Sequence, residues 1–279
     1  MLSSPALTVA GLLASVAVAL GATTGSSPGA HHGTDHGADA SSSAGLRPVA
    51  AKYPTNAAKI FRWGDAVWKD EFVRPLSTTT WRVNHPSLVR DQHGMLTLDS
   101  TPTSGDVVAT ANGGGHQYGR WEARVRTRLY KGTGTPYRAV WELAPTTGGE
   151  HCGARGVELS DYAIGATSAT MHVRNTPGAD FTTSKKLPLG NVFHTYAVEV
   201  TPDHVSWFVD TKVVMTERRP AALSGAVFTP RFRLVSTPGA TMRKGRMQMD
   251  WARYYTLARQ SALPITAPQA TQTTYGAAC

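Results

Sequence analysis

The chain has 279 residues, with 28 Lys and Arg against 19 Asp and Glu, and a formal net charge of +9. Only 17% of the residues are charged, and 27 Gly and 17 Pro favour short strands and turns, which excludes coiled coils, helical repeats and polytopic membrane proteins. The two cysteines form no CxxC pair and are too few for a disulfide scaffold.

The N-terminal region is predicted to lie outside the fold. Residues 6–22 form an apolar run that ends in small residues, which favours a cleaved secretory signal over residues 1–22 rather than an uncleaved anchor, although no Lys or Arg precedes the run. Residues 23–52 follow as a flexible linker rich in Gly, Ser, Ala and His. Its three histidines and two aspartates have metal-ligating chemistry but no rigid frame, so we expect a plain linker and a secreted protein.

The folded unit, residues 53–258, is predicted to consist of strands. Apolar and polar residues alternate in five segments, and a turn at 210–212 makes the fourth of them the first strand of a hairpin. Short strands with Gly, Pro and Asp turns predict an antiparallel sandwich or jelly roll. Residues 259–279 lack periodicity and are predicted to form a disordered tail. The five segments are 95–98, 120–129, 195–200, 205–209 and 247–255.

Motifs in a fixed order connect this unit to a known family. They are WKDEF at 68–72, Trp81, GMLTL at 94–98, YGRWEAR at 118–124, KGTG at 131–134, AVW at 139–141, FHTYAVEV at 193–200, WFVD at 207–210 and MDWARYY at 249–255. Together they resemble glycoside hydrolase family 16, the laminarinase-like enzymes, over about residues 60–257. The resemblance implies an all-β fold, a concanavalin-like β-jelly-roll sandwich of two curved antiparallel sheets with a sugar-binding groove on the concave face. It also implies retaining endo-hydrolysis of a β-linked polysaccharide.

The catalytic strand departs from the family pattern. Retaining hydrolysis needs a nucleophile and a general acid/base about 5–5.5 Å apart, which the family supplies in Glu-x-Asp-x-x-Glu, where a bulge returns the last Glu to the sugar face, or in Glu-x-Asp-x-Glu. The matching stretch here is GVELSDY, residues 156–162. Aligned on Tyr162, Gly156 takes the nucleophile position, Glu158 the auxiliary position and Asp161 the acid/base position. Glycine cannot form a glycosyl-enzyme intermediate, so this alignment predicts that double displacement fails.

Two other alignments stay open. One makes Glu158 the nucleophile and leaves Ser160 and Tyr162 behind it, with a phenol as the proton donor. The other uses Glu158 and Asp161 as the working pair across the bulge. We therefore take Glu158 and Asp161 as the candidate catalytic residues.

The resemblance also suggests groups that contact the sugar. Aromatic rings stack on pyranose faces, although Trp141 fits core packing equally well. Arginines and histidines would make the groove basic and suited to an anionic polymer, unless they are solvated surface residues. The predicted substrate-binding residues are Tyr137, Arg138, Trp141, Arg155 and His172, with His151 and Arg174 beside them.

No cofactor is predicted for the chemistry itself. By resemblance, a structural Ca²⁺ would bind Glu71, the Gly94 carbonyl and Asp250, which otherwise form an ordinary surface pair. Export would favour a bridge between Cys152 and Cys279, although a mobile tail works against it.

Three functions remain open: a family 16 glycosidase or transglycosylase, a catalytically silent domain that binds polysaccharide or cell wall, and a structural spacer. Gly156 favours the last two, whereas Glu158 and Asp161 keep the first. The predicted partner is a polysaccharide; we expect no nucleic acid, no stable membrane insertion and a monomer outside the cell.

Overall fold

The computed structural model describes residues 56–112, 115–146, 156–175 and 178–274. They belong to one compact unit. The predicted signal and linker lie outside the described residues. Within the described part of the chain, no helix is long and apolar enough to cross a membrane.

The first layer, sheet A, contains eight strands. All its strand pairs are antiparallel, and β1 pairs with β17 beside the main path. In spatial order the strands are β14 (Lys212–Glu217), β13 (Val205–Val209), β12 (His194–Val200), β6 (Gly119–Leu129), β17 (Gly245–Tyr255), β4 (Leu96–Asp99) and β3 (Val89–Asp91), with β1 (Trp68–Asp70) off the path.

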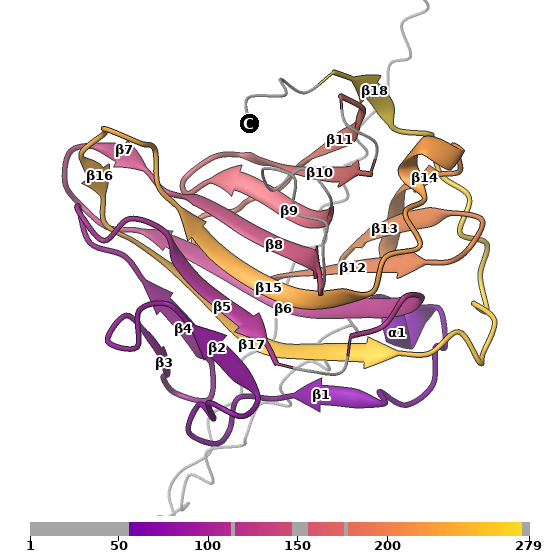
Figure 1. Ribbon diagram of the computed structural model, residues 1–279, viewed down its shortest axis with the longest axis horizontal. Coiled ribbons are helices and arrows are strands. Elements are labelled where there is room, and N and C mark those ends of the chain that lie inside the picture. Colours follow the sequence, from indigo (N-terminus) through magenta and orange to yellow (C-terminus); the bar gives the residue numbers. More distant parts are fainter. Residues whose placement is uncertain (1–55, 113–114, 147–155, 176–177, 275–279) are drawn as a thin grey trace, which may run out of the picture. The chain divides into compact units, whose positions relative to one another are not determined.

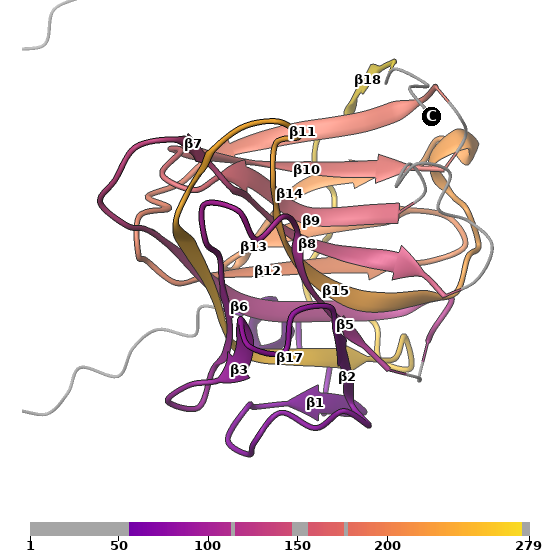
Figure 2. The same cartoon turned by 60° about the vertical axis from the view of Figure 1, so that its left-hand side comes forward.

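The second layer, sheet B, also has eight strands, and its pairs are antiparallel as well. Figure 1 and Figure 2 show β8 to β11 side by side in this layer. Its order is β18 (Thr271–Thr273), β11 (Asp180–Lys186), β10 (Ser168–Arg174), β9 (Gly156–Ala163), β8 (Arg138–Pro145), β15 (Phe228–Val235), β5 (Val107–Ala111) and β2 (Trp81–Val83).

The remaining elements are short. The strands β7 (Thr135–Pro136) and β16 (Met242–Arg243) pair in parallel, α1 spans Ala57–Ile60, and a 3₁₀ turn spans Pro220–Ala222. The predicted sandwich of two antiparallel sheets is confirmed, and so are the strands predicted at 95–98, 120–129, 195–200, 205–209 and 247–255.

The core lies between the two sheets because alternate residues of each strand point inward. Trp121 on β6, Trp207 on β13 and Trp141 on β8 are each at most 1% exposed. Two of these indoles also tie the layers together. Trp207 Nε1 donates to the Glu158 carbonyl oxygen at 3.0 Å, and Trp141 Nε1 donates to the Tyr196 carbonyl oxygen at 3.4 Å.

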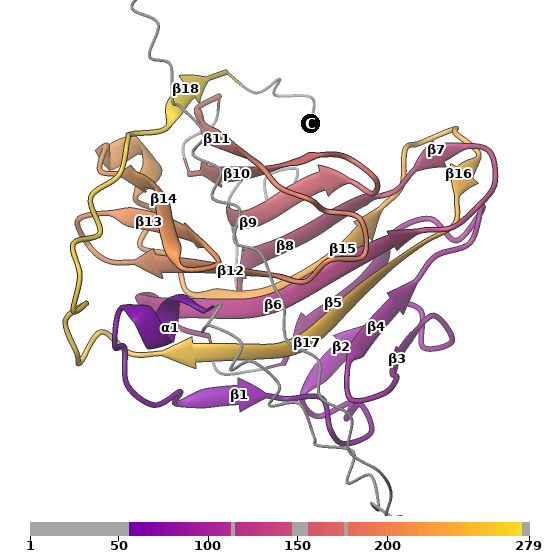
Figure 3. The same cartoon turned by 180° about the vertical axis from the view of Figure 1, so that it is seen from behind.

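A second apolar cluster covers the outer face of sheet A, the side to which the charged residues of β6 point. Phe61 and Trp63, which follow α1, pack against Phe208 and Tyr255. Figure 3 shows α1 in front of sheet A, near β6 and β17. This N-terminal segment buries the outward-facing Glu122 of β6, whose Oε1 accepts the Ala57 N–H at 2.6 Å. The outer face of β6 is therefore partly interior, because a segment distant in sequence lies over it.

Part of the segment for which a disordered tail is predicted, up to residue 274, takes part in the described fold. β18 pairs with β11, Ala270 is only 6% exposed, and the Ala270 carbonyl accepts from Arg219 Nη2 at 2.6 Å. The side chains of this segment show no apolar periodicity, because the segment is held by backbone pairing with β11 and by the burial of one small side chain, Ala270.

Candidate functional site

A β-bulge in β9 sets the geometry of the candidate site. Glu158 pairs with Glu142 of β8, yet Ser160 already pairs with Trp141, so one residue of β9 has no counterpart. Leu159 and Ser160 both point to the core, and they are 1% and 0% exposed. Glu158 and Asp161 consequently point to the same face of the sheet.

This geometry excludes the alignment that uses Tyr162 as a proton donor. Tyr162 is 5% exposed and belongs to the core cluster, and burial raises the pKa of its phenol to about 12. Neither its hydroxyl group nor that of Ser160 lies on the face that holds Glu158. Of the three alignments, only those that place Glu158 and Asp161 together on one face remain.

Gly156 lies on that same face. It pairs directly with Arg174 of β10, and residues that pair directly share a face of the sheet. A Cβ atom added at Gly156 would lie 3.1 Å from the Leu143 carbonyl oxygen, closer than ordinary contact. The position aligned with the family nucleophile therefore has no reactive group and little room for one.

We call the face of sheet B that points away from the core the polar face. Its charged side chains alternate along each strand with core residues such as Trp141, Val157 and Phe232. Those on and around β9 include Arg138 and Glu142 on β8, Glu158 and Asp161 on β9, His172 and Arg174 on β10, Asp180 on β11, and Arg231 and Arg233 on β15.

Glu158 is a buried acid of the polar face, 6% exposed, and it lies beside a second acid, Asp161. Burial, and then the negative charge of Asp161, raise the pKa of Glu158 to about 7, although His172 and Arg174 oppose the shift. Its Oε1 accepts from Arg174 Nη1 at 3.4 Å, whereas its Oε2 is buried and has no hydrogen-bond donor within the described ranges of the chain. Near neutral pH this carboxyl group can therefore hold or release a proton.

Asp161 is held by Arg138, which is half exposed. The guanidinium group donates from Nε to Oδ1 at 2.9 Å and from Nη2 to Oδ2, a bidentate pair across β8 and β9. Such a pair stabilises the ionised carboxylate and fixes its orientation. Asp161 thus has a permanent positive partner.

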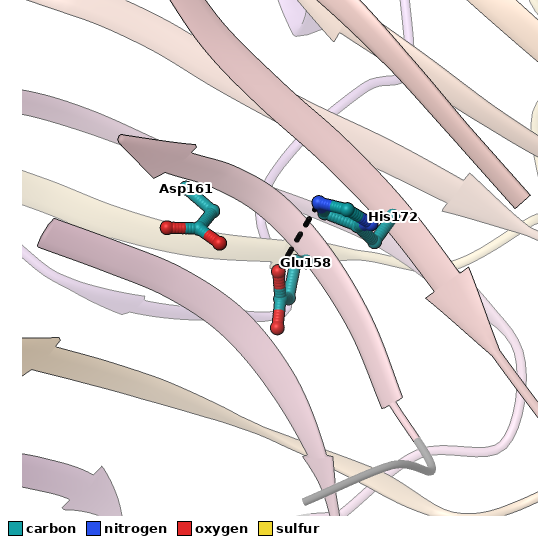
Figure 4. Close-up of side chains that lie close together, drawn as sticks. All are labelled: Glu158, Asp161 and His172. Atoms are coloured by element: carbon teal, nitrogen blue, oxygen red, sulfur yellow. Dashed lines mark ion pairs between the residues drawn. The ribbon is translucent and has the colours of Figure 1, made fainter. Parts of the chain in front are cut away.

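His172 lies between Asp180 and Glu158. Figure 4 shows the side of its ring that faces Glu158. Its Nδ1 contacts Asp180 Oδ1 at 2.9 Å, and its Nε2 lies 3.9 Å from Glu158 Oε2. Burial opposes ionisation of Asp180, but the hydrogen bonds from His172 and Arg174 keep the pKa of Asp180 below its usual value. Because an ionised carboxylate only accepts, Nδ1 is the protonated nitrogen and donates to it.

The arginines of the polar face are paired rather than open. Arg231 Nε and Arg233 Nε lie 2.6 and 2.7 Å from Glu142 Oε1, and Arg174 contacts both Glu158 and Asp180. The predicted basic groove is therefore largely neutralised by its own carboxylates.

Two predicted sugar-binding aromatics lie in the core. Tyr137 is 0% exposed, and its hydroxyl group donates to the Thr101 carbonyl oxygen at 2.7 Å. Trp141 is 1% exposed and packs on Phe232 with ring centroids 4.7 Å apart. Tyr137 as a sugar platform is wrong in this structure because its ring points between the sheets, and for Trp141 the core alternative holds.

The remaining predicted site residues divide into two groups. Arg138, His172, Glu158 and Asp161 come together on the polar face. Arg155, His151, Cys152 and Cys279 lie outside the described residues, so the predicted cysteine bridge stays a prediction.

The predicted calcium ligands are engaged by arginines. Glu71 accepts from Arg253 at 3.0 Å and 2.9 Å through its two oxygens, and Asp250 accepts from Arg124 Nη1 at 2.5 Å. A cation here would have to displace or adjoin these guanidinium groups. The donor set as arranged does not fit a calcium ion.

Four polar-face residues were missed by the sequence analysis: Asp180, Glu142, Arg231 and Arg233. The period-two pattern of β15, in which Arg231 and Arg233 alternate with Phe232 and Leu234, is a signal that could have placed the two arginines on one face. Asp180 had no such signal, because its role depends on the pairing of β10 with β11.

Comparisons with known proteins agree with this architecture. The model of glycosyl hydrolases family 16 matches residues 76–253. A search of curated proteins finds no match.

Solved structures share the fold at low sequence identity. The laminarinase catalytic domain of Thermotoga petrophila is 16% identical with a TM-score of 0.55, and the match covers 70% of this chain and 98% of that one. The laminarinase of Flavobacterium sp. UMI-01 is 18% identical with a TM-score of 0.55, covering 69% and 100%. A structure from work on endo-acting O-glycanases of the human gut microbiota is 17% identical with a TM-score of 0.59, covering 69% and 100%. These neighbours confirm the predicted jelly-roll fold.

Proposed function

Because the chain belongs to glycoside hydrolase family 16, we propose that it binds a β-linked polysaccharide on the polar face of sheet B and does not cleave it by the usual double displacement. The family match covers most of the folded unit, and the neighbours named as laminarinases or endo-1,3-β-glucanases favour a β-glycan ligand. In line with the predicted signal, we place the protein outside the cell.

One observation carries this proposal: the residue of β9 that pairs with Arg174 on the polar face is Gly156. Double displacement requires a carboxylate that forms a covalent bond to the sugar. Glycine offers none at this position, whereas the polar face keeps the donors and acceptors that hydroxyl groups need. Binding is therefore better supported than turnover.

The groups that would contact sugar hydroxyls are polar rather than aromatic. Arg138 is half exposed, and His172 and Arg174 keep a smaller exposed part of their side chains. With Tyr137 and Trp141 in the core, hydrogen bonds and not ring stacking would dominate recognition at these strands.

A second candidate function, hydrolysis by Glu158 and Asp161, is favoured by their spacing. Ligand atoms of the two carboxyl groups lie within 4.8 Å of one another, close to the separation in retaining enzymes. Glu158 would be the proton donor, and the ionised Asp161 the nucleophile. The bidentate pair with Arg138 opposes this role, because it stabilises the charge of the Asp161 carboxylate and so lowers its nucleophilicity.

A panel of laminarin, mixed-linkage β-glucan and galactan tests both candidates. We expect saturable binding by calorimetry and no release of reducing ends. Arg138→Ala should weaken binding, whereas Arg218→Ala, an exposed arginine after β14 on sheet A, should not. Absence of binding to every polymer counts against the proposal.

Reducing ends released by the parent protein and lost in both Glu158→Gln and Asp161→Asn would establish the second candidate. Activity that survives both changes would eliminate this carboxyl pair altogether. Activity that appears only with Gly156→Glu would support the binding function of the parent chain and identify residue 156 as the missing nucleophile position.

A further inference from the structure

Three side chains on the polar face converge with metal-ligating atoms. One such atom from each of Glu158, Asp161 and His172 lies within 4.8 Å of the other two (Figure 4). The bulge in β9 brings Asp161 to the face of Glu158, and the pairing of β9 with β10 sets His172 directly opposite Glu158. All three come from paired strands, so the backbone fixes their positions.

One oxygen of the Glu158 carboxyl group, Oε2, accepts no hydrogen bond from the described residues. Glu158 is 6% exposed, and its Oε2 is buried without a hydrogen-bond donor among the described residues. His172 Nε2 lies 3.9 Å from Glu158 Oε2, which is too far for a hydrogen bond. A buried carboxylate oxygen without a partner is costly, so this oxygen is suited to a positively charged ligand between it and His172.

The imidazole of His172 is already oriented for coordination. Its Nδ1 donates to Asp180 at 2.9 Å, which leaves the lone pair on Nε2, the nitrogen that faces Glu158. A histidine that donates its other nitrogen to a carboxylate is the usual arrangement around protein-bound zinc. Asp180 therefore has the position of an orienting group behind a ligand.

We propose that Glu158, Asp161 and His172 bind a divalent transition-metal ion of the Zn²⁺ type, with Asp180 orienting His172. One imidazole and two carboxylates suit such an ion better than Ca²⁺, which takes oxygen ligands only. Ligands of a tetrahedral zinc ion lie roughly 3.4 Å apart. The three ligand atoms here lie within 4.8 Å of one another, so the carboxyl side chains would have to rotate to bring them to about 3.4 Å.

The neighbouring arginines leave lone pairs for the ion. Arg174 contacts the other oxygen of Glu158, Oε1, and Arg138 uses one lone pair on each oxygen of Asp161. A carboxylate has about four acceptor sites, so coordination and these ion pairs are compatible. The two positive charges lower the affinity for a cation. The ion would also offer open coordination positions to sugar hydroxyl groups. This role in sugar recognition rests on the proposed function, whereas the binding of the metal ion is independent of it.

Calorimetric titration of the full chain with Zn²⁺, and visible absorption with Co²⁺, test the site. Four further side chains with zinc-ligating chemistry, all outside the described residues, are removed in the background protein by His31→Ala, His32→Ala, His36→Ala and Cys152→Ser. We expect one ion per chain. His172→Ala and Glu158→Gln should each weaken binding more than about tenfold, and Asp180→Asn about 10- to 100-fold. The control His85→Ala, on the loop before β3, should leave binding unchanged.

Absence of binding in the background protein, or binding that survives His172→Ala, would overturn the proposal. Thermal melts of each variant establish that it is folded, and Asp180→Asn gives a second test that leaves all three ligands in place. Zinc binding without glycan binding upholds the metal site and contradicts the proposed function. Glycan binding that persists in a chelator, with zinc binding intact, upholds the proposed function and the metal site but overturns the role of the ion in sugar recognition.

Discussion

Glu158 and Asp161 point to the same face of β9 although three positions separate them, because Leu159 and Ser160 both turn into the core. A regular strand would have placed Asp161 between the sheets, where an unpaired carboxylate is prohibitively costly. The bulge is therefore what makes an acidic site out of this strand. It also decides between the alignments, since Tyr162 is left inside.

Tyr137 provides a test of core placement against sugar contact. Tyr137→Ala should lower the free energy of unfolding by about 3–5 kcal/mol, because it removes a fully buried ring. Tyr137→Phe keeps the ring but loses the hydrogen bonds of the hydroxyl group to the Thr101 carbonyl oxygen and the Ser104 hydroxyl group, and should cost about 1–2 kcal/mol. Urea unfolding measures both. A Phe variant of normal stability that no longer binds glycan would contradict the core assignment.

The C-terminal strand is expected to contribute to stability. Ala270→Asp places a charge at a position that is 6% exposed in the core cluster, so we expect a loss of about 2 kcal/mol or more. The adjacent Gln269→Asp is exposed and should be nearly neutral. Thermal melts of the two variants compare them directly. Equal melting temperatures would mean that this segment is not packed as described.

Calcium should not stabilise the protein through Glu71 and Asp250. Both carboxylates already accept hydrogen bonds from arginines, Arg253 and Arg124, so an added ion has to compete with a positive charge. We expect the same melting temperature in calcium and in chelator. A rise in calcium that disappears in Glu71→Gln would restore the site suggested by the family resemblance.

Local patterns predicted the strands but not what lies over them. Alternation located β6 and β17, and the turn at 210–212 gave the β13–β14 hairpin, because side-chain periodicity is a property of the strand itself. Alternation puts Glu122 on the face of β6 opposite Trp121 and Ala123, but it does not show what covers that face. Only the packing of α1 and its following aromatics on the outer face buries it.

The same division holds for the candidate site. Glu158 and Asp161 could be predicted from the motif at 156–162, and His172 could be predicted from the family resemblance. The support of His172 by Asp180 depends on strand pairing across residues that the sequence does not connect. Tyr137 was misassigned because a single aromatic residue beside a strand does not reveal which face it occupies.

Glu122 predicts how stability depends on pH. Burial raises the pKa of its carboxyl group to about 7 from 4.5, against the N–H groups of Ala58 and Ala57 and the charge of Arg253. Between these two pH values the folded protein retains a proton that the unfolded chain has released. Stability therefore falls as pH rises through this window, by a total of about 3 kcal/mol from this group.

Glu122→Gln removes that titration while keeping an acceptor for the Ala57 N–H. Urea unfolding at pH 5 and pH 8 should show a smaller loss of stability in the variant than in the parent. The difference between the two proteins is the diagnostic quantity, because Glu158 has a raised pKa as well and contributes to both. Asp203→Asn, at an exposed position, serves as the control. If the parent and Glu122→Gln lose the same free energy of unfolding, Glu122 is not buried as a neutral acid under the N-terminal segment.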